Sequence, residues 1–182
     1  MNESITMPLL ERNFVVKYNE DGLDDMITVR QQYSRDVAAF LIYDPQKGFL
    51  FEKRIRPTDP LFDKTIIPAG KTENPGERSF PLWAATWECF EEFNVVLPIV
   101  IPLSSLFDPQ QRNMLYPFLM TGQPWGVITN QEPEKKDLVW VAPDVVYHSL
   151  GGRTIVNPMF QVATTQKILL DAKDKMTKFK II

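Results

Sequence analysis

The sequence predicts an α+β fold, an α/β/α sandwich built around a mixed β-sheet. β-Prone segments come first, a helix-forming segment follows, more β-prone segments come next, and helix-forming segments close the chain. The segment Asp36–Tyr43 is apolar almost throughout, which is typical of a strand buried on both faces. A length of 182 residues, with 44% hydrophobic and 24% charged residues, suits one domain with a sizeable core.

An N-terminal hairpin is expected ahead of the main domain. Phe14–Tyr18 and Met26–Gln32 are β-prone, and the sequence Asn-Glu-Asp-Gly at 19–22 between them is a turn signal. We therefore divide the chain into a strand extension at 1–34, which could serve dimerisation, and a main domain at 35–182.

The main domain is expected to open with a second hairpin. Asp36–Tyr43 and Phe49–Arg56 flank the turn-forming segment Asp44–Gly48. Pro57 ends the second strand, and a loop then leads to a further strand at Lys64–Ile67.

Strands are expected again after the central helix. Leu97–Leu106 is extended but contains two prolines, which place it toward a sheet edge. Leu115–Thr121 and Leu138–Val141 are further strands, and the polar connection Gly122–Lys136 between them is long enough to suggest a functional loop.

The chain is expected to end in two helices. The first covers Asp144–Ser149 and gives His148 a structural place among apolar neighbours. Asn157 is expected to cap the second, with Pro158 at its first position, and the basic tail Lys173–Lys180 is expected to fray. The apolar stripe of the last helix comprises Met159, Val162, Ala163, Leu169 and Leu170.

The central helix has recognisable ends. Ser79 is a suitable N-cap, Pro81 is tolerated in the first turn, and Asn94 can adopt the left-handed conformation that closes a helix. The loop before the helix, 69–77, contains two glycines, which permit unusual backbone angles.

Three carboxylates share one face of this helix. Glu88, Glu91 and Glu92 stand at positions i, i+3 and i+4, where like charges repel. Because Mg²⁺ and Mn²⁺ prefer oxygen ligands, a carboxylate cluster beside a glycine-containing loop indicates a site for a hard divalent cation. The alternative is a solvated helix face with no ligand.

The stretch from Ile67 to Val95 resembles the box of Nudix hydrolases, G-x5-E-x7-R-E-U-x-E-E-x-G-U, where U is a bulky aliphatic residue. The segment departs from this pattern by one extra residue before the first Glu, a longer spacing after it, Trp87 in place of Arg, and Asn94 in place of Gly. Lys71 or Arg78 could supply the missing positive charge. The positions that match the box are Gly70, Glu77, Glu88, Cys89, Glu91, Glu92 and Val95.

The resemblance extends over most of the chain and points to the ADP-ribose pyrophosphatase branch, which carries an N-terminal strand pair. It implies that Arg56, with Arg54, binds substrate phosphate, Arg being suited to bidentate contacts. It also implies that the carbonyl of Ala69, in the sequence IPAG, helps to hold metal. The segment with Pro109 resembles the branch's proline-containing segment after the box.

The resemblance implies Mg²⁺- or Mn²⁺-dependent hydrolysis of a diphosphate that joins a nucleoside to another group, with ADP-ribose or a related nucleotide sugar as substrate. Glu88 and Glu92 would bind metal, Glu91 and Ala69 would assist, and Glu77 would be an outer ligand or an orienting group. Glu134 or Glu132, in the loop after Thr121, would be the general base. Trp125 could stack on a base or sugar, or could instead fill a dimer interface.

Composition narrows the partners and the location. A net charge of −3 argues against nucleic acid, and no apolar stretch is long enough to span a membrane. The single cysteine, Cys89, excludes an internal disulfide and fits a reducing cytoplasm, and the N-terminus lacks signal-peptide features. The resemblance implies a homodimer. The alternative function is a Nudix domain that binds a nucleotide without cleaving it, as a sensor or interaction module.

Overall fold

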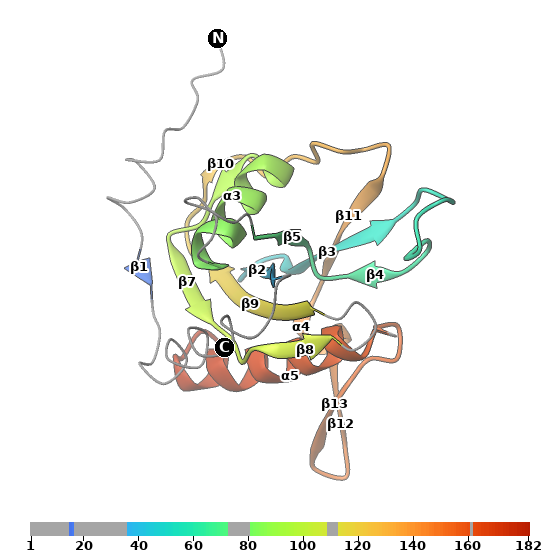
Figure 1. Cartoon of the computed structure of the whole chain (residues 1–182). Helices are drawn as coiled ribbons and strands as arrows, with labels where there is room; N and C mark the ends of the chain where they lie inside the picture. The colour runs from blue at the N-terminus through green and yellow to red at the C-terminus, as the bar shows by residue number, and fades with distance from the viewer. Residues whose placement is uncertain (1–14, 17–35, 73–80, 109–112, 161) are drawn as a thin grey trace.

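The computed structural model of the chain describes residues 15–16, 36–72, 81–108, 113–160 and 162–182 (Figure 1). No helix in these ranges is long and apolar enough to cross a membrane.

A nine-stranded mixed sheet forms the centre of the molecule, with the main order β1-β7-β9-β2-β3-β11. The pairs β1–β7 and β2–β9 are parallel, and the other pairs are antiparallel. The short strands β4, β5 and β8 pair with β3, β2 and β9, respectively. The strands of this sheet are β1 (Val15–Val16), β2 (Asp36–Asp44), β3 (Gly48–Arg54), β4 (Thr65–Ile66), β5 (Ala69–Lys71), β7 (Ile99–Pro102), β8 (Leu106–Asp108), β9 (Asn113–Thr121) and β11 (Lys136–Val141).

One helix covers each face of the sheet, which confirms the predicted α+β sandwich (Figure 1). Alternate residues of β2 point to opposite faces, as in any strand. Phe40 packs with α3 (Pro81–Phe93), whereas Leu41 packs in the second core cluster with α5 (Ala163–Lys178). Both side chains are fully buried, so β2 is the doubly covered strand that its apolar sequence predicted.

The expected hairpin of the main domain is present, because β2 and β3 pair in antiparallel register from Ile42 opposite Leu50 to Asp44 opposite Gly48. Gly48 has a φ of +92°, and a Cβ on it would lie 2.2 Å from the carbonyl oxygen of Val141. The turn therefore requires glycine.

The expected edge strand at Leu97–Leu106 consists of two strands, β7 and β8, which both pair with β9. On its other side β7 pairs with Val15–Val16, the part of the expected N-terminal hairpin that the structure describes. The remainder of that hairpin lies outside the described residues.

The short helix predicted at Asp144–Ser149 was wrong in its extent. Helix α4 ends at Val146, and the next residues form the hairpin of β12 (Tyr147–Leu150) and β13 (Arg153–Val156), which projects from the sandwich (Figure 1). Gly151 and Gly152, both at positive φ, make the tight turn. His148 is consequently an exposed strand residue, not part of an apolar helix.

The last helix begins later than predicted and continues further. Asn157 accepts a hydrogen bond from the Met159 N–H at 3.0 Å in a turn that precedes the helix, so the predicted cap was wrong. Helix α5 runs from Ala163 to Lys178, so the basic tail is helical for most of its length. The short sheet that completes the fold pairs β6 (Val95–Val96) with β10 (Trp125–Gly126).

Candidate active site

Helix α3 presents its carboxylates from a rigid base. Its apolar face, which includes Ala85, Cys89 and Phe93, is buried against the sheet. Asn94 has a φ of +54° and ends the helix in the predicted left-handed conformation. Glu88 and Glu92, one helical turn apart, are partly buried, whereas Glu91 is exposed.

Glu88 lies directly against the loop that the sequence assigned to metal binding. A Cβ atom on Gly70 would lie 1.9 Å from Cδ of Glu88, so a side chain at position 70 would occupy the space of this carboxylate. Gly70 belongs to β5, which also contains Ala69. The structure therefore brings together Glu88 and the Ala69–Gly70 segment.

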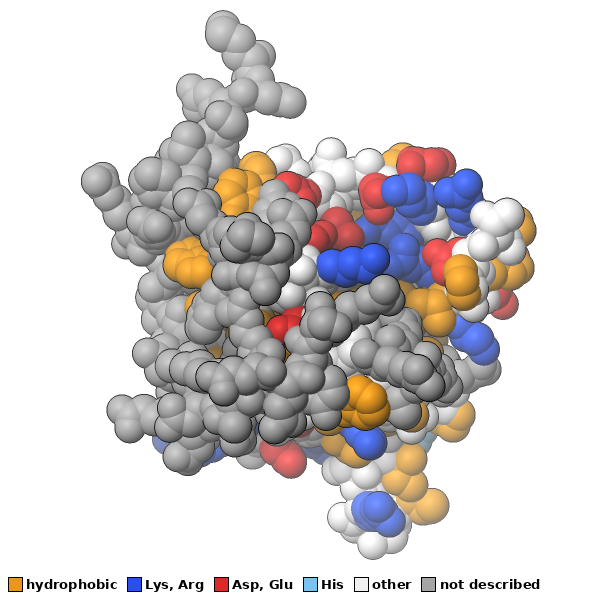
Figure 2. Space-filling model, viewed as in Figure 1, with side chains coloured by type: hydrophobic (Ala, Val, Ile, Leu, Met, Phe, Trp, Pro, Cys, Tyr) orange, Lys and Arg blue, Asp and Glu red, His pale blue; other side chains and the backbone are white. Residues whose placement is uncertain are grey.

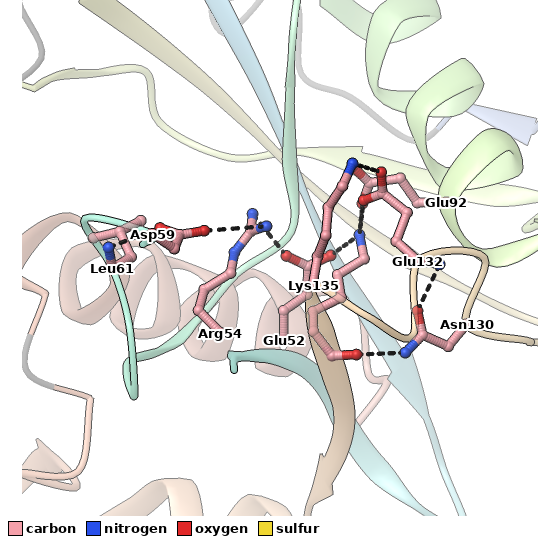
Figure 3. A network of polar contacts seen from close by, with 9 residues as sticks. Glu52, Arg54, Asp59, Leu61, Glu92, Asn130, Glu132 and Lys135 are labelled. Atoms are coloured by element: carbon pink, nitrogen blue, oxygen red, sulfur yellow. Dashed lines mark hydrogen bonds and ion pairs between the residues drawn. The ribbon is translucent and has the colours of Figure 1, made fainter. Parts of the chain in front are cut away.

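Glu92 belongs to a network of charged side chains that connects α3 to the sheet (Figure 3). The Nζ atom of Lys136, at the start of β11, lies 2.7 Å from Oε2 of Glu92 and also pairs with Oε1 of Glu52 on β3. Arg54 pairs with the other oxygen of Glu52 at 3.0 Å. On the face seen in Figure 2, acidic and basic side chains gather in the upper right part of the molecule.

Burial sets the electrostatics of this network. The side chains of Lys136 and Glu52 have no exposed surface. Burial raises the pKa of Glu92, repulsion from Glu52 raises it further, and Lys136 opposes both effects. Burial alone would lower the pKa of Lys136, but the charges of Glu52 and Glu92 outweigh it and raise that pKa, so the ammonium stays charged.

The loop that precedes β11 is attached to the end of α3. The Gln131 N–H donates to the carbonyl of Glu92 at 3.1 Å, and the Thr129 N–H donates to the carbonyl of Phe93 at 3.0 Å. These bonds satisfy carbonyls that a helix C-terminus leaves without intrahelical partners. Glu132 of this loop lies 3.5 Å from Lys136 and also pairs with Lys135. Of the two candidate bases, Glu132 is thus the one joined to the Glu92 network, while Glu134 is exposed.

A cavity of about 630 Å³ adjoins the site. Ala69, Gly70 and Arg54 line it, together with Lys64 and Lys71. Small-molecule sites commonly occupy cavities of this size. Its other lining residues come from β2, the β3–β4 loop, β4, β8, β9 and the start of α5.

The predicted substrate-binding residues occupy different surroundings. Arg54 is the last residue of β3 and lines the cavity. The strand ends two residues earlier than predicted, so Arg56 is exposed beyond its end. Trp125, in β10, is 38% exposed and is not among the residues lining the cavity. Glu77 and Arg78 lie outside the described residues.

The candidate metal ligands at the Glu88 end of the site are oxygen donors, the type of ligand that a hard divalent cation prefers. Glu88, Glu92 and the Ala69 carbonyl offer oxygen atoms, the ligands that Mg²⁺ prefers, and Gly70 leaves the space that Glu88 fills. Glu92 has already directed one oxygen to Lys136. Within the described part of the chain, no three His, Cys, Asp or Glu side chains form a metal-binding group by themselves.

Sequence reasoning missed two central residues, Glu52 and Lys136. A signal for Glu52 was present, because a glutamate within the apolar run Phe-Leu-Phe-Glu of a buried strand needs a partner. Lys136 stands next to Lys135 at the end of a polar loop, so the sequence alone does not distinguish the two lysines. The register of β11, which places Lys136 opposite Arg54, does so.

No model of a known protein family matches the sequence, and no curated protein does either. Solved structures do match the fold. The MutT NUDIX hydrolase from Burkholderia pseudomallei has a TM-score of 0.56 at 20% identity, over 75% of this chain and 96% of that one. An ADP compounds hydrolase has a TM-score of 0.61 at 15% identity, over 82% and 76% of the two chains.

The NUDIX domain of Shewanella oneidensis NrtR, complexed with ADP ribose, gives a TM-score of 0.51 at 16% identity, over 78% of this chain and 86% of that one. This chain therefore has the Nudix hydrolase fold, as the box-like segment predicted. The fold is shared at identities too low to transfer an activity.

Proposed function

We propose that this protein hydrolyses the diphosphate of a nucleoside diphosphate linked to another group, giving a nucleoside monophosphate and a phosphorylated product. ADP-ribose or a related nucleotide sugar is the leading substrate, and Mg²⁺ or Mn²⁺ the cofactor. The resemblance of the sequence to the ADP-ribose pyrophosphatase branch favours this substrate class.

One observation carries the proposal: Glu88 lies against Gly70, at the border of a cavity that Arg54 and Lys64 also line. A diphosphate needs positive charge around its oxygens, while its hydrolysis needs carboxylates to bind a cation and to accept a proton. Basic side chains in the cavity and carboxylates beside it supply these two requirements on opposite sides of one segment, Ala69–Gly70.

Each residue of the site has a separate role in the proposed reaction. Arg54 binds phosphate oxygens in the cavity, and Trp125 and Arg56 remain further candidates for substrate contact. Glu88 and Glu92, assisted by Glu91, Glu77 and the Ala69 carbonyl, hold the divalent cation. Glu132 or Glu134 accepts the proton of the attacking water. A cation held at this site would neutralise diphosphate charge and activate water.

The experiment is product release from a panel of compounds with and without Mg²⁺ or Mn²⁺. The panel contains ADP-ribose, UDP- and GDP-sugars, NADH, dinucleoside polyphosphates and a nucleoside triphosphate. Metal-dependent cleavage of one class establishes the reaction and its substrate. Turnover by Glu88→Gln and Glu92→Gln that stays within about twofold of wild type, a difference below 0.5 kcal/mol in the barrier, would refute their role as metal ligands.

The same assay separates the two candidate bases. We expect Glu132→Gln to reduce kcat by about 100-fold, the usual contribution of a general base, and Glu134→Gln to change it little if Glu132 has the role. The opposite ranking would assign the role to Glu134.

A second candidate function is nucleotide binding without cleavage. Trp87 carries no charge at the position where the Nudix pattern has Arg, which favours a site with reduced activity. The absence of cleavage across the panel, with thermal stabilisation by one compound, would support this function.

The resemblance also favours a homodimer in the cytoplasm, in which the N-terminal segment contributes to the interface. Sedimentation of the full chain and of a chain lacking residues 1–34 tests the oligomeric state.

A further inference from the structure

Lys136 is an unusual lysine because its ammonium is fully buried among carboxylates from three segments. Its partners are Glu52 on β3, Glu92 on α3 at 2.7 Å, and Glu132 in the preceding loop at 3.5 Å. The Phe93 ring lies below the same nitrogen, 5.1 Å from Nζ to the ring centroid. An ammonium has three N–H donors, so three carboxylates match its full capacity.

The other two carboxylates of this cluster each have a second cationic partner, which leaves Lys136 as the partner of Glu92. Glu52 has a second cation in Arg54, and Glu132 has a second cation in Lys135. Among the described residues, the cation that pairs with Glu92 is Lys136. A buried charge is strongly unfavourable without such compensation.

Hydrogen bonds to the backbone of Lys136 fix the position of this residue. The side-chain amide of Asn130 donates to the carbonyl of Lys136 at 2.6 Å, and the Lys136 N–H donates to the carbonyl of Glu132 at 3.2 Å. The same loop binds the Glu92 carbonyl through Gln131. The end of α3, the loop and the start of β11 therefore form one connected unit around the Lys136–Glu92 pair.

Of the other positions considered for this charge, the structure describes 87 and 71. The Trp87 ring packs edge-on against Phe90, with ring centroids 6.2 Å apart. Lys71 is exposed at the cavity, on the segment that adjoins Glu88. Arg78 lies outside the described residues.

We infer that Lys136 is a positioning residue, whose ammonium fixes the Glu92 carboxylate in the orientation in which it serves the diphosphate-hydrolysing site. The inference rests on the proposed function, including its divalent-cation site at Glu88 and Glu92. Lys136 itself contacts neither substrate nor cation, and it acts through Glu92.

The test uses Lys136→Met, which keeps the length of the side chain and removes its charge, with Lys53→Met as the matched control. Lys53 is also a strand lysine in an ion pair, but it pairs with Asp63 at 3.0 Å on the surface. The first readout is Mn²⁺ binding to the full-length protein without nucleotide, followed by electron paramagnetic resonance. Residues that orient metal ligands contribute about 10–100-fold to metal affinity, so we expect at least a tenfold weaker affinity for Lys136→Met and little change for Lys53→Met.

The second readout separates positioning from substrate binding. We expect kcat to fall by about 10–100-fold for Lys136→Met while KM changes little, because the substrate pocket itself is intact. In the Glu92→Gln background the same substitution should have no further effect on Mn²⁺ affinity or kcat, since the carboxylate that it positions is already altered.

A folding control is required because Lys136→Met leaves buried carboxylates without their cation. Glu52→Gln/Lys136→Met removes one negative and one positive charge together, so the net charge of the cluster is unchanged while Glu92 still lacks Lys136. This double variant should fold, as monitored by circular dichroism, and should show the same loss of Mn²⁺ affinity. Affinity that is unchanged or tighter than wild type in the folded double variant would overturn the inference, because Lys136 would then be a structural or competing cation.

The two hypotheses fail separately. If the wild-type protein binds Mn²⁺ but cleaves nothing in the panel, the proposed function fails and the Mn²⁺ measurement still tests Lys136. If the wild-type protein cleaves a compound while Lys136→Met matches Lys53→Met in both readouts, the inference fails and the function stands.

Discussion

The ammonium of Lys136 lies 2.7 Å from Oε2 of Glu92, although 44 positions separate the two residues in the sequence. This contact joins β11 to the helix that carries the carboxylates of the Nudix-like segment. A cation from a later part of the chain thus pairs with Glu92 on the acidic face of α3.

Removing this cation should destabilise the fold far more than removing its neighbour. Loss of one partner from a buried ion pair costs about 3–5 kcal/mol, so Lys136→Ala should lower the free energy of unfolding by this amount. Lys135 is 42% exposed, and loss of such a pair costs about 0–1 kcal/mol. Urea denaturation of Lys136→Ala and Lys135→Ala measures both values. Equal losses would mean that burial of Lys136 does not dominate its contribution.

Trp87→Arg should leave turnover almost unchanged, since Lys136 already supplies a positive charge to Glu92. The Nudix pattern has Arg at this position, so a defect there would predict a gain of tenfold or more, about 1.4 kcal/mol in the barrier. We expect a change smaller than about twofold, measured as kcat/KM on the best substrate of the panel. A gain of tenfold would show that the charge of Lys136 does not compensate for Trp87.

The sequence predicted the fold from local signals that the structure retains. The apolar pattern of β2 and the glycine turn into β3 depend on neighbours in the chain, and both predictions are confirmed. The helix ending at Asn94 is confirmed for the same reason, because a left-handed residue is a local property. The C-terminal error concerned Asp144–Ser149, which was predicted as a helix, whereas Tyr147–Leu150 pairs with Arg153–Val156 in a hairpin.

The site was predictable only where it lies within one segment. Glu88 and Gly70 belong to the same box-like stretch, and the structure places them in contact. Lys136 and Glu52 reach Glu92 through strand pairing between β11 and β3, and a one-residue shift of that register would turn Lys136 to the opposite face. Long-range register cannot be obtained from charge patterns in a single sequence.

Gly70→Ala should impair the site with little effect on stability. The new methyl group would lie 1.9 Å from Cδ of Glu88, and this flexible side chain must move away. Turnover should therefore fall by about tenfold or more, while the free energy of unfolding should change by less than about 1 kcal/mol, since the clash involves a side-chain end. Lys53→Ala, a surface position on β3 outside the cavity lining, is the control, with no such clash. Wild-type turnover in Gly70→Ala would exclude a role for the Glu88 position.

The register of α5 against the sheet can be tested with two adjacent leucines. Leu169 is fully buried in the core cluster below β2, whereas Leu170 is 40% exposed, although the sequence placed both on one stripe. Burial predicts a loss of about 2–5 kcal/mol for Leu169→Ala. For Leu170→Ala we expect at most about 0.5 kcal/mol, the usual range of surface substitutions. Thermal and urea denaturation measure both, and similar losses would contradict the helix orientation.

Arg54 and Arg56 were both predicted to bind substrate, and the structure ranks them. Arg54 lines the cavity, and its guanidinium is held 3.0 Å from Glu52, whereas Arg56 is exposed beyond the strand. Hydrogen bonds to charged groups contribute about 1.5–3 kcal/mol, so Arg54→Gln should raise KM by about tenfold or more. Arg56→Gln should leave KM nearly unchanged.

The stability control for this pair is favourable, because Lys136 still compensates Glu52 after Arg54 is replaced. Arg54→Lys keeps the charge but loses the planar fork of the guanidinium, so its KM should lie between those of wild type and Arg54→Gln. Steady-state kinetics on the folded variants gives the three values. A large KM effect from Arg56→Gln alone would mean that substrate phosphate binds outside the cavity, beyond the end of β3.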